Sequence, residues 1–359
     1  MSEWNEYKLG DLISIKYGKD HKGLKDGPYP VYGSGGVMRY ADKYLYDKES
    51  ILIPRKGSLN NIFYQDRAFW TVDTMFWSEI DTTKVFPKFL YYQLTLVDFE
   101  NLNVGSAVPS LTIPIINDVD VSLPPLDEQK RIAGVLSSLD DKIDLLHREN
   151  ATLEALAETL FRHYFIENPN PGWKEGKLGD VCHYVTDKMD TSSLTTISYI
   201  STENMLNDKQ GVTEASSIPN DIRVTRYGVG DILLSNIRPY FKKIWLADRR
   251  GGCSNDVLCI RANEKEFDCF VYYTLRQDDF FDYVMLGSKG CKMPRGDKQH
   301  IMNWPICLPN VESLGVFNKP VLLMIQKIKS NQQQILALTT QRDILLPCLM
   351  SGEVKVDEL

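Results

Sequence analysis

The sequence lacks any long hydrophobic run and any recognisable signal segment. No apolar stretch approaches the roughly 18 residues that a membrane-spanning helix needs. The first residues, Met1–Trp4, contain neither the basic nor the apolar region of a secretory signal. The hydrophobic fraction of 43% indicates a folded protein, and the length of 359 residues indicates several domains. Because a signal segment and a membrane span are missing, we expect the protein to be cytosolic.

Cysteine is missing from the first half of the chain, and no two cysteines are spaced as C-x-x-C. Disulfide frameworks use even numbers of cysteines in secreted proteins, and zinc sites use closely spaced ligand pairs. We therefore expect reduced, unpaired thiols and no bound metal. The cysteines are Cys182, Cys253, Cys259, Cys269, Cys291, Cys307 and Cys348.

A basic excess is missing too. The 41 basic and 48 acidic side chains give a net charge of -7, which excludes a protein that binds nucleic acid through its overall charge. A local basic surface is compatible with this value. Residues 125–167 are the most acidic segment, with five basic and nine acidic side chains. We expect this segment to face a protein partner or water, and not phosphate.

Recognisable catalytic motifs are also absent. Gly33–Gly36 lacks the lysine of an ATP-binding loop, and Leu123–Leu126 lacks the polar and aromatic residues that flank the proline pair of an adenine methyltransferase. No Glu-x-Lys fragment follows the Pro-Asp pair of a nuclease. The histidines show no metal-ligand or triad spacing, so each is expected to be structural or solvated. They are His21, His147, His163, His183 and His300. Together these absences favour a binding protein over an enzyme.

An internal repeat organises the chain. Segments of the first half return in the same order in the second half: Trp4–Leu12 as Trp173–Val181, Phe89–Leu94 as Phe270–Leu275, and Leu123–Pro124 as Leu308–Pro309. We therefore predict a first recognition domain (1–124), a first spacer helix (125–167), a second recognition domain (168–310), and a second spacer helix with a C-terminal tail (311–359).

Each repeat is expected to end in one long helix. The first follows Pro124 and Pro125, has Asp127 as its candidate N-cap, and runs to about Phe165. Roughly 38 residues at about 1.5 Å each make a rod of about 57 Å. Its heptad seam comprises Ile132, Leu136, Leu139, Ile143, Leu146, Asn150, Leu153, Ala157 and Leu160. The matching seam of the second helix comprises Phe317, Val321, Met324, Ile328, Asn331, Ile335, Leu338, Arg342 and Leu345.

The polar residues in these two seams suggest how the helices align. Antiparallel pairing about a local twofold axis places Asn150 opposite Asn331, and a buried asparagine pair fixes register at some cost in stability. The alternative is that Asn150 is exposed at a kink in its helix. The expected fold class is α/β, with two pseudo-symmetric globular domains separated by two long antiparallel coiled-coil helices.

Clusters of cations with glycine, aromatic and amide residues mark candidate DNA-binding loops, because cations bind phosphate and Arg, Lys, Asn and Gln bind base edges. The first domain contributes Lys19, Lys22, Arg55, Lys56, Ser58, Asn60 and Asn61. The second contributes Asn236, Arg238, Tyr240, Lys242, Lys243, Lys289, Lys292 and Arg295. Arg55 and Arg238 follow equivalent predicted strands. The alternative for each residue is an ordinary solvated surface charge.

At this point the whole chain resembles the specificity subunit of a type I restriction-modification system. The resemblance lies in the repeated Trp-x-Glu-x-Lys-Leu-Gly-Asp openings, the strand Ile51–Ile53 leading to Ser58, the segment Leu123–Ala133 that enters a long helix, and the closing Leu349–Val354. It implies double-stranded DNA as ligand, with each domain recognising one half of a bipartite site and the helices serving as spacer.

The resemblance also implies partners. Two methyltransferase subunits would dock on the helices, with Glu128, Gln129 and Arg131 as candidate docking residues, and restriction or translocase subunits would join them. S-adenosylmethionine, ATP and magnesium would belong to these partners, and this chain would hold no cofactor and no metal. The second helix begins with Leu308–Leu314, whose sequence departs from that of Leu123–Gln129. Symmetric docking is therefore in doubt.

The sequence allows two other functions. One is a stand-alone DNA methyltransferase or nuclease, which the missing motifs disfavour. The other is a coiled-coil assembly protein that binds no specific DNA, for which the basic clusters would have no role. Neither the bases recognised nor the length of the spacer between half-sites follows from the sequence, because both depend on docking geometry.

Overall fold

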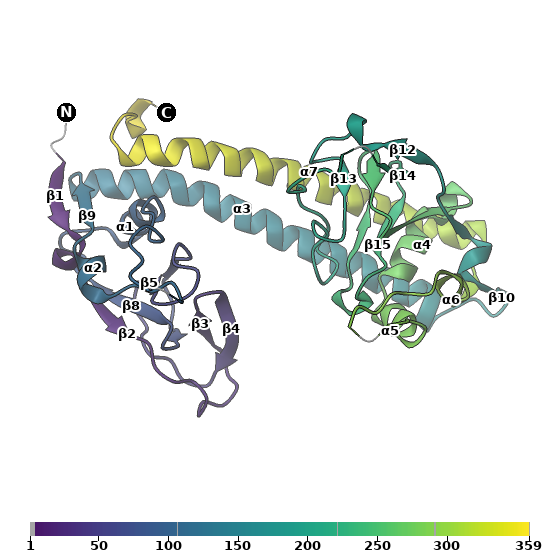
Figure 1. The fold of residues 1–359 in the computed structure, drawn as a ribbon, viewed down its shortest axis with the longest axis horizontal. Coiled ribbons are helices and arrows are strands. Elements are labelled where there is room, and N and C mark those ends of the chain that lie inside the picture. Colours follow the sequence, from purple (N-terminus) through teal and green to yellow (C-terminus); the bar gives the residue numbers. More distant parts are fainter. Residues whose placement is uncertain (1–3, 106, 221, 291, 359) are drawn as a thin grey trace. The chain divides into compact units, whose positions relative to one another are not determined.

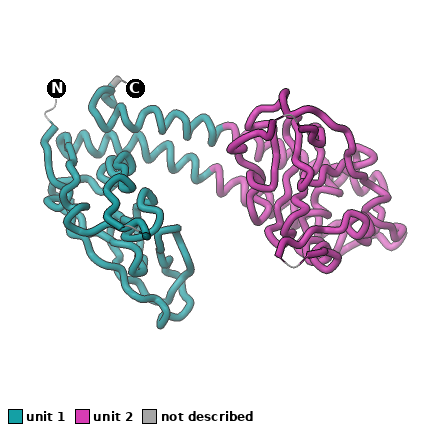
Figure 2. Tube along the Cα trace, in the orientation of Figure 1, with its two compact units in different colours: residues 1–145, 334–359 teal, residues 146–333 magenta. Residues whose placement is uncertain are grey.

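The structure is a computed structural model that describes residues 4–105, 107–220, 222–290 and 292–358. It divides into two compact units, which are coloured separately in Figure 2. Unit 1 comprises residues 1–145 and 334–359, and unit 2 comprises residues 146–333. Cys291 lies outside the described residues, and the other six cysteines are free thiols.

Unit 1 is built on three small sheets (Figure 1). A four-stranded antiparallel sheet has the order β2-β8-β5-β6, a three-stranded sheet has the order β4-β3-β7, and β1 pairs with β9. The strands are β1 (Asn5–Lys8), β2 (Ile13–Tyr17), β3 (Tyr29–Gly33), β4 (Gly36–Ala41), β5 (Ser50–Pro54), β6 (Phe63–Gln65), β7 (Trp70–Thr71), β8 (Met75–Ile80) and β9 (Asp120–Leu123). Two short helices complete the domain, α1 (Pro87–Thr95) and α2 (Ile113–Asn117).

Strand β5 is buried along its whole length, because it packs on both faces. Its successive side chains point to opposite faces of the sheet. Ile51 and Ile53 join a core with Phe89 of α1, whereas Leu52 joins a second core with Phe69. Because both faces of β5 are buried, its sequence is continuously apolar from Ile51 to Pro54 and does not alternate with polar residues.

Unit 2 repeats the same plan. Its sheets have the orders β11-β18-β15-β16, β12-β14-β17-β13 and β10-β19. The strands are β10 (Lys174–Lys177), β11 (Cys182–Tyr184), β12 (Lys188–Asp190), β13 (Tyr199–Ile200), β14 (Arg223–Tyr227), β15 (Ile232–Ser235), β16 (Ile244–Leu246), β17 (Gly251–Cys253), β18 (Val257–Ala262) and β19 (Pro305–Leu308). The short helices are α4 (Asp268–Leu275), α5 (Asp278–Leu286) and α6 (Lys298–Met302).

The strand order confirms the internal repeat. Strands β2, β8, β5 and β6 of unit 1 occupy the same places as β11, β18, β15 and β16 of unit 2, with antiparallel pairing throughout. The ladder β1-β9 corresponds to β10-β19. Each ladder joins the start of a domain to the residues just before its long helix, so the entry and exit of the domain lie side by side.

Two long helices, α3 (Leu126–Phe161) and α7 (Val311–Met350), run through both units. In unit 1, Ile132 and Leu136 near the start of α3 share a core with Leu349 near the end of α7. Nη1 of Arg342 lies 2.9 Å from Oδ1 of Asp140. The two helices are therefore antiparallel here.

The pairing within unit 2 has the same antiparallel sense. The rings of Phe161 and Phe317 lie 5.9 Å apart, and Nδ2 of Asn331 donates to Oδ1 of Asn150 over 2.9 Å. The structure thus joins the two asparagines that the heptad register places opposite each other. All members of both predicted seams are buried or half-buried. Asn331 is fully buried, and Asn150 is half-buried within a continuous helix.

The ends of α3 differ from the sequence-based expectation. The first N–H groups of the helix, those of Glu128 and Gln129, bond to the carbonyl oxygen of Pro125, so Asp127 lies within the first turn and is not the N-cap. At the other end, α-helical geometry stops at Phe161 and one π-helical segment, Arg162–Glu167, continues the rod. No helix in the described part of the chain has the length and apolar character needed to cross a membrane.

We expect the asparagine pair to reduce stability. Oδ1 of Asn331 is buried without a hydrogen-bond partner, which costs about 1–3 kcal/mol. Replacing both residues, Asn150→Leu with Asn331→Leu, is expected to raise the free energy of unfolding by about 1–2 kcal/mol. Calorimetry would then show a higher melting temperature, by about 2–4 °C per kcal/mol. A lower melting temperature for the double variant would show instead that the amide pair stabilises the fold.

A second prediction concerns Asp268, the first residue of α4. Burial raises the pKa of its carboxyl group to about 6, an effect that Lys265 opposes and Asp231 reinforces. Because the folded pKa exceeds the unfolded value, stability falls as pH rises through this range. Asp268→Asn is expected to stabilise the protein by about 1 kcal/mol at pH 7, after allowance for its partial exposure, and hardly at all at pH 4.

Thermal unfolding at the two pH values measures this difference. Glu264→Gln, which removes an exposed charge from the same region that does not shift the pKa of Asp268, is the matched control. An equal effect of Asp268→Asn at both pH values would contradict a raised pKa of Asp268 in the folded protein.

Candidate nucleic-acid interface

The sheet of unit 1 gathers several predicted DNA-binding segments at one edge. Strands β2 and β5 both run antiparallel to β8, so they are parallel to each other and end at the same edge. The chain leaves β2 toward Lys19 and leaves β5 toward Arg55 and Lys56. The turn before β8 contributes Asp73 and Thr74 at this edge.

Arg55 is held in place by its surroundings. Its guanidinium lies 5.4 Å from the ring centroid of Tyr17, and Nη1 donates to the carbonyl oxygen of Asp73 over 3.3 Å. The backbone N–H of Arg55 donates to the carbonyl oxygen of Thr74 over 2.8 Å. A half-exposed guanidinium that is stacked and anchored in this way can present its remaining N–H groups to a base or a phosphate.

The rest of this cluster divides into exposed and internally bonded residues. The side chains of Lys19, Lys22, Lys56 and Ser58 are exposed. Lys22 lies in a separate turn, where its backbone N–H bonds to Asp20. The amides of Asn60 and Asn61 are exposed, but they donate to Asp98 over 3.4 Å and to the carbonyl oxygen of Ser34 over 3.1 Å, respectively. These two amides therefore shape the loop in this structure.

Unit 2 has the same edge with other side chains. Strands β11 and β15 end together, and β15 leads into Asn236, Ile237 and Arg238. The N–H of Arg238 donates to the carbonyl oxygen of Pro294 over 2.8 Å, as Gly57 donates to that of Pro109 over 3.1 Å in unit 1.

These backbone contacts set the correspondence between the two loops residue by residue. Ile237 pairs with Arg295 as Lys56 pairs with Ser110. Arg55 therefore corresponds to Asn236, and Arg238 corresponds to Gly57. The two arginines follow equivalent strands, but they do not occupy equivalent positions.

Each edge also has a second loop, and only the one in unit 2 was predicted from the sequence. Lys289 and Arg295 are bonded to each other through their backbones, over 3.0 Å in both directions, and Val104 is bonded to Ser110 over 3.1 Å. Residues 289–298 were found from their cations. The equivalent loop of unit 1 carries none, and so it was missed, although Gly105 and Pro109 recur as Gly290 and Pro294 at the repeat spacing.

Several cations predicted to bind DNA in unit 2 have partners within the protein. Nζ of Lys289 lies 2.9 Å from Asp297, Nη2 of Arg295 lies 3.1 Å from Asp256, and Nζ of Lys242 lies 2.8 Å from Asp278. Nζ of Lys243 donates to the carbonyl oxygen of Thr202 over 2.7 Å. Lys292 and Tyr240 have exposed side chains. Lys188, which sequence reasoning missed, lies just beyond β11, and its Nζ donates to Thr225 and Asn255.

These contacts shift the pKa values of the groups. The hydrogen bond from Lys289, together with those from the helix N–H groups of His300 and Gln299, lowers the pKa of Asp297 to about 2. The hydrogen bond with Asp278 raises the pKa of Lys242, whereas burial lowers that of Lys243.

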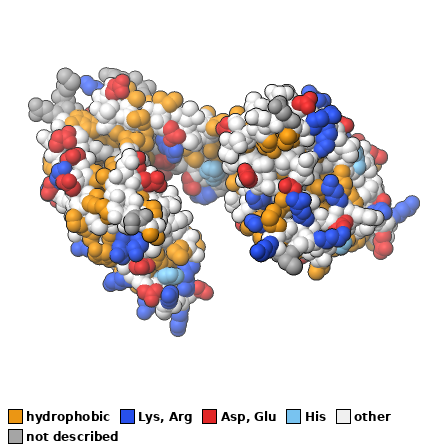
Figure 3. Space-filling view, in the orientation of Figure 1, with side chains coloured by type: hydrophobic (Ala, Val, Ile, Leu, Met, Phe, Trp, Pro, Cys, Tyr) orange, Lys and Arg blue, Asp and Glu red, His pale blue; other side chains and the backbone are white. Residues whose placement is uncertain are grey.

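Figure 3 shows how the charges are distributed over one face of each unit. In unit 1 the Lys and Arg side chains gather mainly toward the end away from α3 and α7, mixed with Asp and Glu. In unit 2 they are spread over the visible face. On the faces shown, basic groups are therefore interspersed with acidic ones, and the local basic surface stays a prediction.

The start of α3 gives one correction. Gln129 was predicted to contact a partner, but it is buried, and its Nε2 donates to the carbonyl oxygen of Pro124 over 2.8 Å. Its Oε1 accepts from the N–H of Phe86 over 2.8 Å. Because a buried amide needs such bonds, Gln129 fastens the helix to its own domain. Glu128 is half-exposed, and the exposed Arg131 pairs with Asp357 over 2.7 Å.

The start of α7 has different chemistry. Leu314, which is fully buried, occupies the position of Gln129, and the side chain of Asn310 accepts a hydrogen bond from the N–H of Ser313. Val316 is exposed where α3 has Arg131. Among the described residues, no group of three or more His, Cys, Asp or Glu side chains could hold a metal ion.

Comparisons with known proteins agree with this arrangement. Residues 1–155 match the family model of the type I restriction modification DNA specificity domain. The chain is 26% identical to the type I restriction enzyme MjaIX specificity subunit of Methanocaldococcus jannaschii, over 99% of this chain and 89% of that protein. It is 21% identical to the EcoDI specificity subunit of Escherichia coli, over 98% and 92% of the respective chains.

A solved structure resembles the fold as a whole. The crystal structure of the S subunit of a type I restriction-modification system from M. genitalium aligns with a TM-score of 0.64 and 16% sequence identity. The alignment covers 97% of this chain and 96% of that chain.

Gly57, in the loop after β5, has a backbone conformation that favours glycine. Its φ of +94° lies in the left-handed region, and an added Cβ would come within 2.8 Å of Oγ of Ser34. Gly57→Ala is expected to lower the free energy of unfolding by about 1–2 kcal/mol, measured by chemical denaturation. Gly23→Ala is the control, because a Cβ there meets nothing within 4 Å. Equal effects of the two substitutions would contradict the assigned conformation.

Proposed function

We propose that this chain is a specificity subunit of a type I restriction-modification system, as its similarity to such subunits supports, and that units 1 and 2 each recognise one half of a bipartite DNA site. The chain is the sequence-specific DNA-binding subunit of its complex and is not itself an enzyme.

One observation carries this assignment. The two sheet edges share their backbone hydrogen bonds but differ in side chains: Arg55 corresponds to Asn236, Lys56 to Ile237, Gly57 to Arg238 and Ser110 to Arg295. Sequence is recognised by side chains that reach base edges, while the scaffold sets register on the duplex. Equivalent scaffolds with unlike side chains suit two domains that bind DNA similarly and recognise different bases.

The partners follow from the family. We propose that two methyltransferase subunits dock on the helices, with the exposed surface around Glu128 and Arg131 at one site, and that restriction or translocase subunits join this complex. S-adenosylmethionine, ATP and magnesium are assigned to those subunits. In support, the sequence has neither the ATP-binding loop nor the methyltransferase loop that this chemistry needs.

The proposal predicts that the half-sites can be lost one at a time. Methylation mapping of cells that carry the whole system first identifies the site. In the assembled complex, Arg55→Ala with Lys56→Ala is expected to reduce discrimination at one half-site by about 5–150-fold and to leave the other unchanged. Arg238→Ala with Arg295→Ala is expected to affect only the other half-site.

Binding to duplexes with one scrambled half-site measures both effects. Lys174→Ala, which removes an exposed cation from β10, is the control. If both double variants weakened the two half-sites equally, the assignment of one half-site to each unit would be wrong. If they left binding unchanged, the basic clusters would have no role in DNA recognition. Methyl transfer by the isolated chain would support an enzyme instead.

A further inference from the structure

Two loops of unit 2 contain every non-glycine residue with positive φ in the described part of the chain. Asp208 and Lys209 have φ values of 53° and 63°, and Arg238 and Lys242 have values of 51° and 50°. Side chains rarely adopt this conformation, and it persists where the surroundings determine it strongly. The second loop is the one that follows β15 at the candidate DNA-binding edge.

The two loops hold each other through their backbones. The N–H of Asp208 donates to the carbonyl oxygen of Phe241, and the N–H of Lys209 donates to that of Lys242, both over 2.9 Å. The shape of residues 238–243 therefore depends on residues 207–211.

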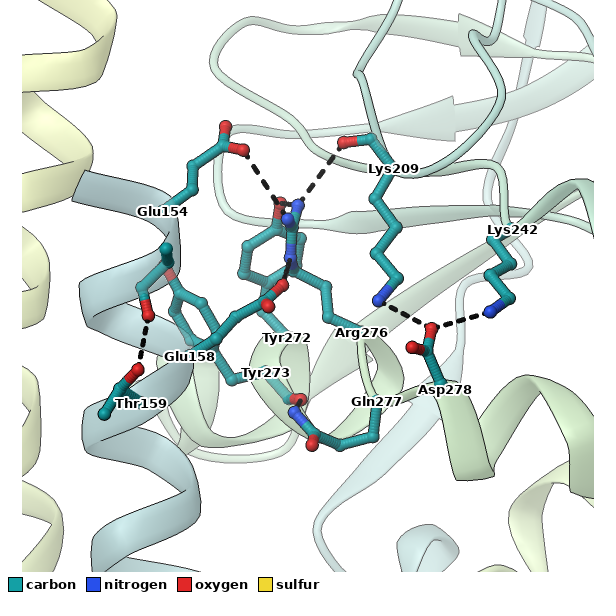
Figure 4. Close-up of polar contacts among 11 residues, drawn as sticks. Glu154, Glu158, Thr159, Lys209, Lys242, Tyr272, Tyr273, Arg276, Gln277 and Asp278 are labelled. Atoms are coloured by element: carbon teal, nitrogen blue, oxygen red, sulfur yellow. Dashed lines mark hydrogen bonds and ion pairs between the residues drawn. The ribbon is translucent and has the colours of Figure 1, made fainter. Parts of the chain in front are cut away.

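Asp278, at the start of α5, joins the side chains of both loops (Figure 4). Its Oδ1 lies 2.9 Å from Nζ of Lys209 and 2.8 Å from Nζ of Lys242. The two lysine side chains are 15% and 29% exposed. Because both bind the same carboxylate oxygen, their positive charges lie close together. Without Asp278, the two ammonium groups would repel each other.

Arg276 ties the same assembly to α3, as Figure 4 shows. Its guanidinium is almost fully buried and lies 2.9 Å from Oε1 of Glu158 and 3.6 Å from Oε2 of Glu154. It also donates to the hydroxyl of Tyr272 over 3.0 Å and to the carbonyl oxygen of Lys209 over 3.4 Å. A continuous set of contacts therefore runs from the helix to the loop after β15.

The charges around Lys242 are unsuited to phosphate. Besides Asp278, the carboxylates of Asp282 and Asp208 lie near enough to raise the pKa of its amine. A phosphate group placed here would face these negative charges. Lys242 was predicted from sequence to bind DNA, but its surroundings indicate an internal role.

We propose that Asp278 and Arg276 are positioning residues for DNA recognition, which hold the 238–243 loop in its DNA-binding shape through Lys209 and Lys242. Lys242 is then an internal tether and not a phosphate contact. This inference rests on the proposed function of unit 2. Unit 1 has no counterpart of Arg276 among its described residues. The repeat aligns Arg276 with Thr95, whose hydroxyl donates within α1 to the carbonyl oxygen of Tyr92.

The test uses Asp278→Asn in the complete complex, with duplexes carrying both half-sites or one scrambled half-site. Asp278 is exposed, so the variant is expected to fold. Discrimination at the half-site recognised by unit 2 is expected to fall at least tenfold, with the other half-site unchanged. Non-specific affinity is expected to stay the same or rise, because the substitution removes a negative charge.

The salt dependence of binding separates a tether from a phosphate contact. Lys242→Met is expected to reproduce the loss at one half-site while the slope of log K against log salt stays constant. If Lys242 contacted phosphate, this slope would fall by about one and all sequences would be bound more weakly. That result, or full discrimination by Asp278→Asn, would overturn the inference.

Two further variants sharpen the comparison. Asp279→Asn removes the same charge from the neighbouring exposed residue and leaves both Asp278 ion pairs in place, so it is expected to behave like the wild type. Glu158→Gln tests the contact with α3 and is expected to weaken the same half-site only. A wild-type complex without any half-site discrimination would instead contradict the proposed function itself.

Discussion

Both units depend on burying the seam between α3 and α7. A long helix in water gains little from its own hydrogen bonds, so most of its stability comes from packing an apolar face. In unit 1, Leu136 of α3 and Leu349 of α7 enter the same core as the sheet, and in unit 2 Phe161 and Phe317 do the same. Each buried side chain of this size contributes about 1.5–3 kcal/mol. The helices are therefore part of each domain core, and the sheets keep their positions on the helices because they share it.

The sequence predicts this part well, because burial imposes a periodic pattern. The repeat, the seam and the pairing of Asn150 with Asn331 all follow from spacing. The candidate site was less predictable, because a side chain's partner often lies far away in the sequence. Gln129 resembled an exposed docking residue until the structure showed its bonds to Pro124 and Phe86. The loop at Gly105 carries no cation, so charge does not reveal it, whereas the repeat spacing does.

The two candidate DNA-binding edges show how one backbone conformation is supported when the side chains differ. At the position of Gly57 the left-handed conformation costs little, because glycine has no Cβ. At the equivalent position, Arg238 adopts the same region with a long side chain, so its loop needs support from elsewhere. The backbone bonds between the two loops of unit 2 and the contacts of Lys209 and Lys242 with Asp278 supply it. The loop with arginine at this position thus has more supporting contacts than the loop with glycine.

The composition of unit 1 has a consequence for synthesis on the ribosome. Its core needs Ile132 from the early part of the chain and Leu349 from the last part. At about 5–20 residues per second, the intervening chain takes on the order of 10–40 s to emerge. During that interval the apolar face at the start of α3 lacks its partner, while unit 2, formed from one continuous segment, can already fold. The domain made first is therefore completed last.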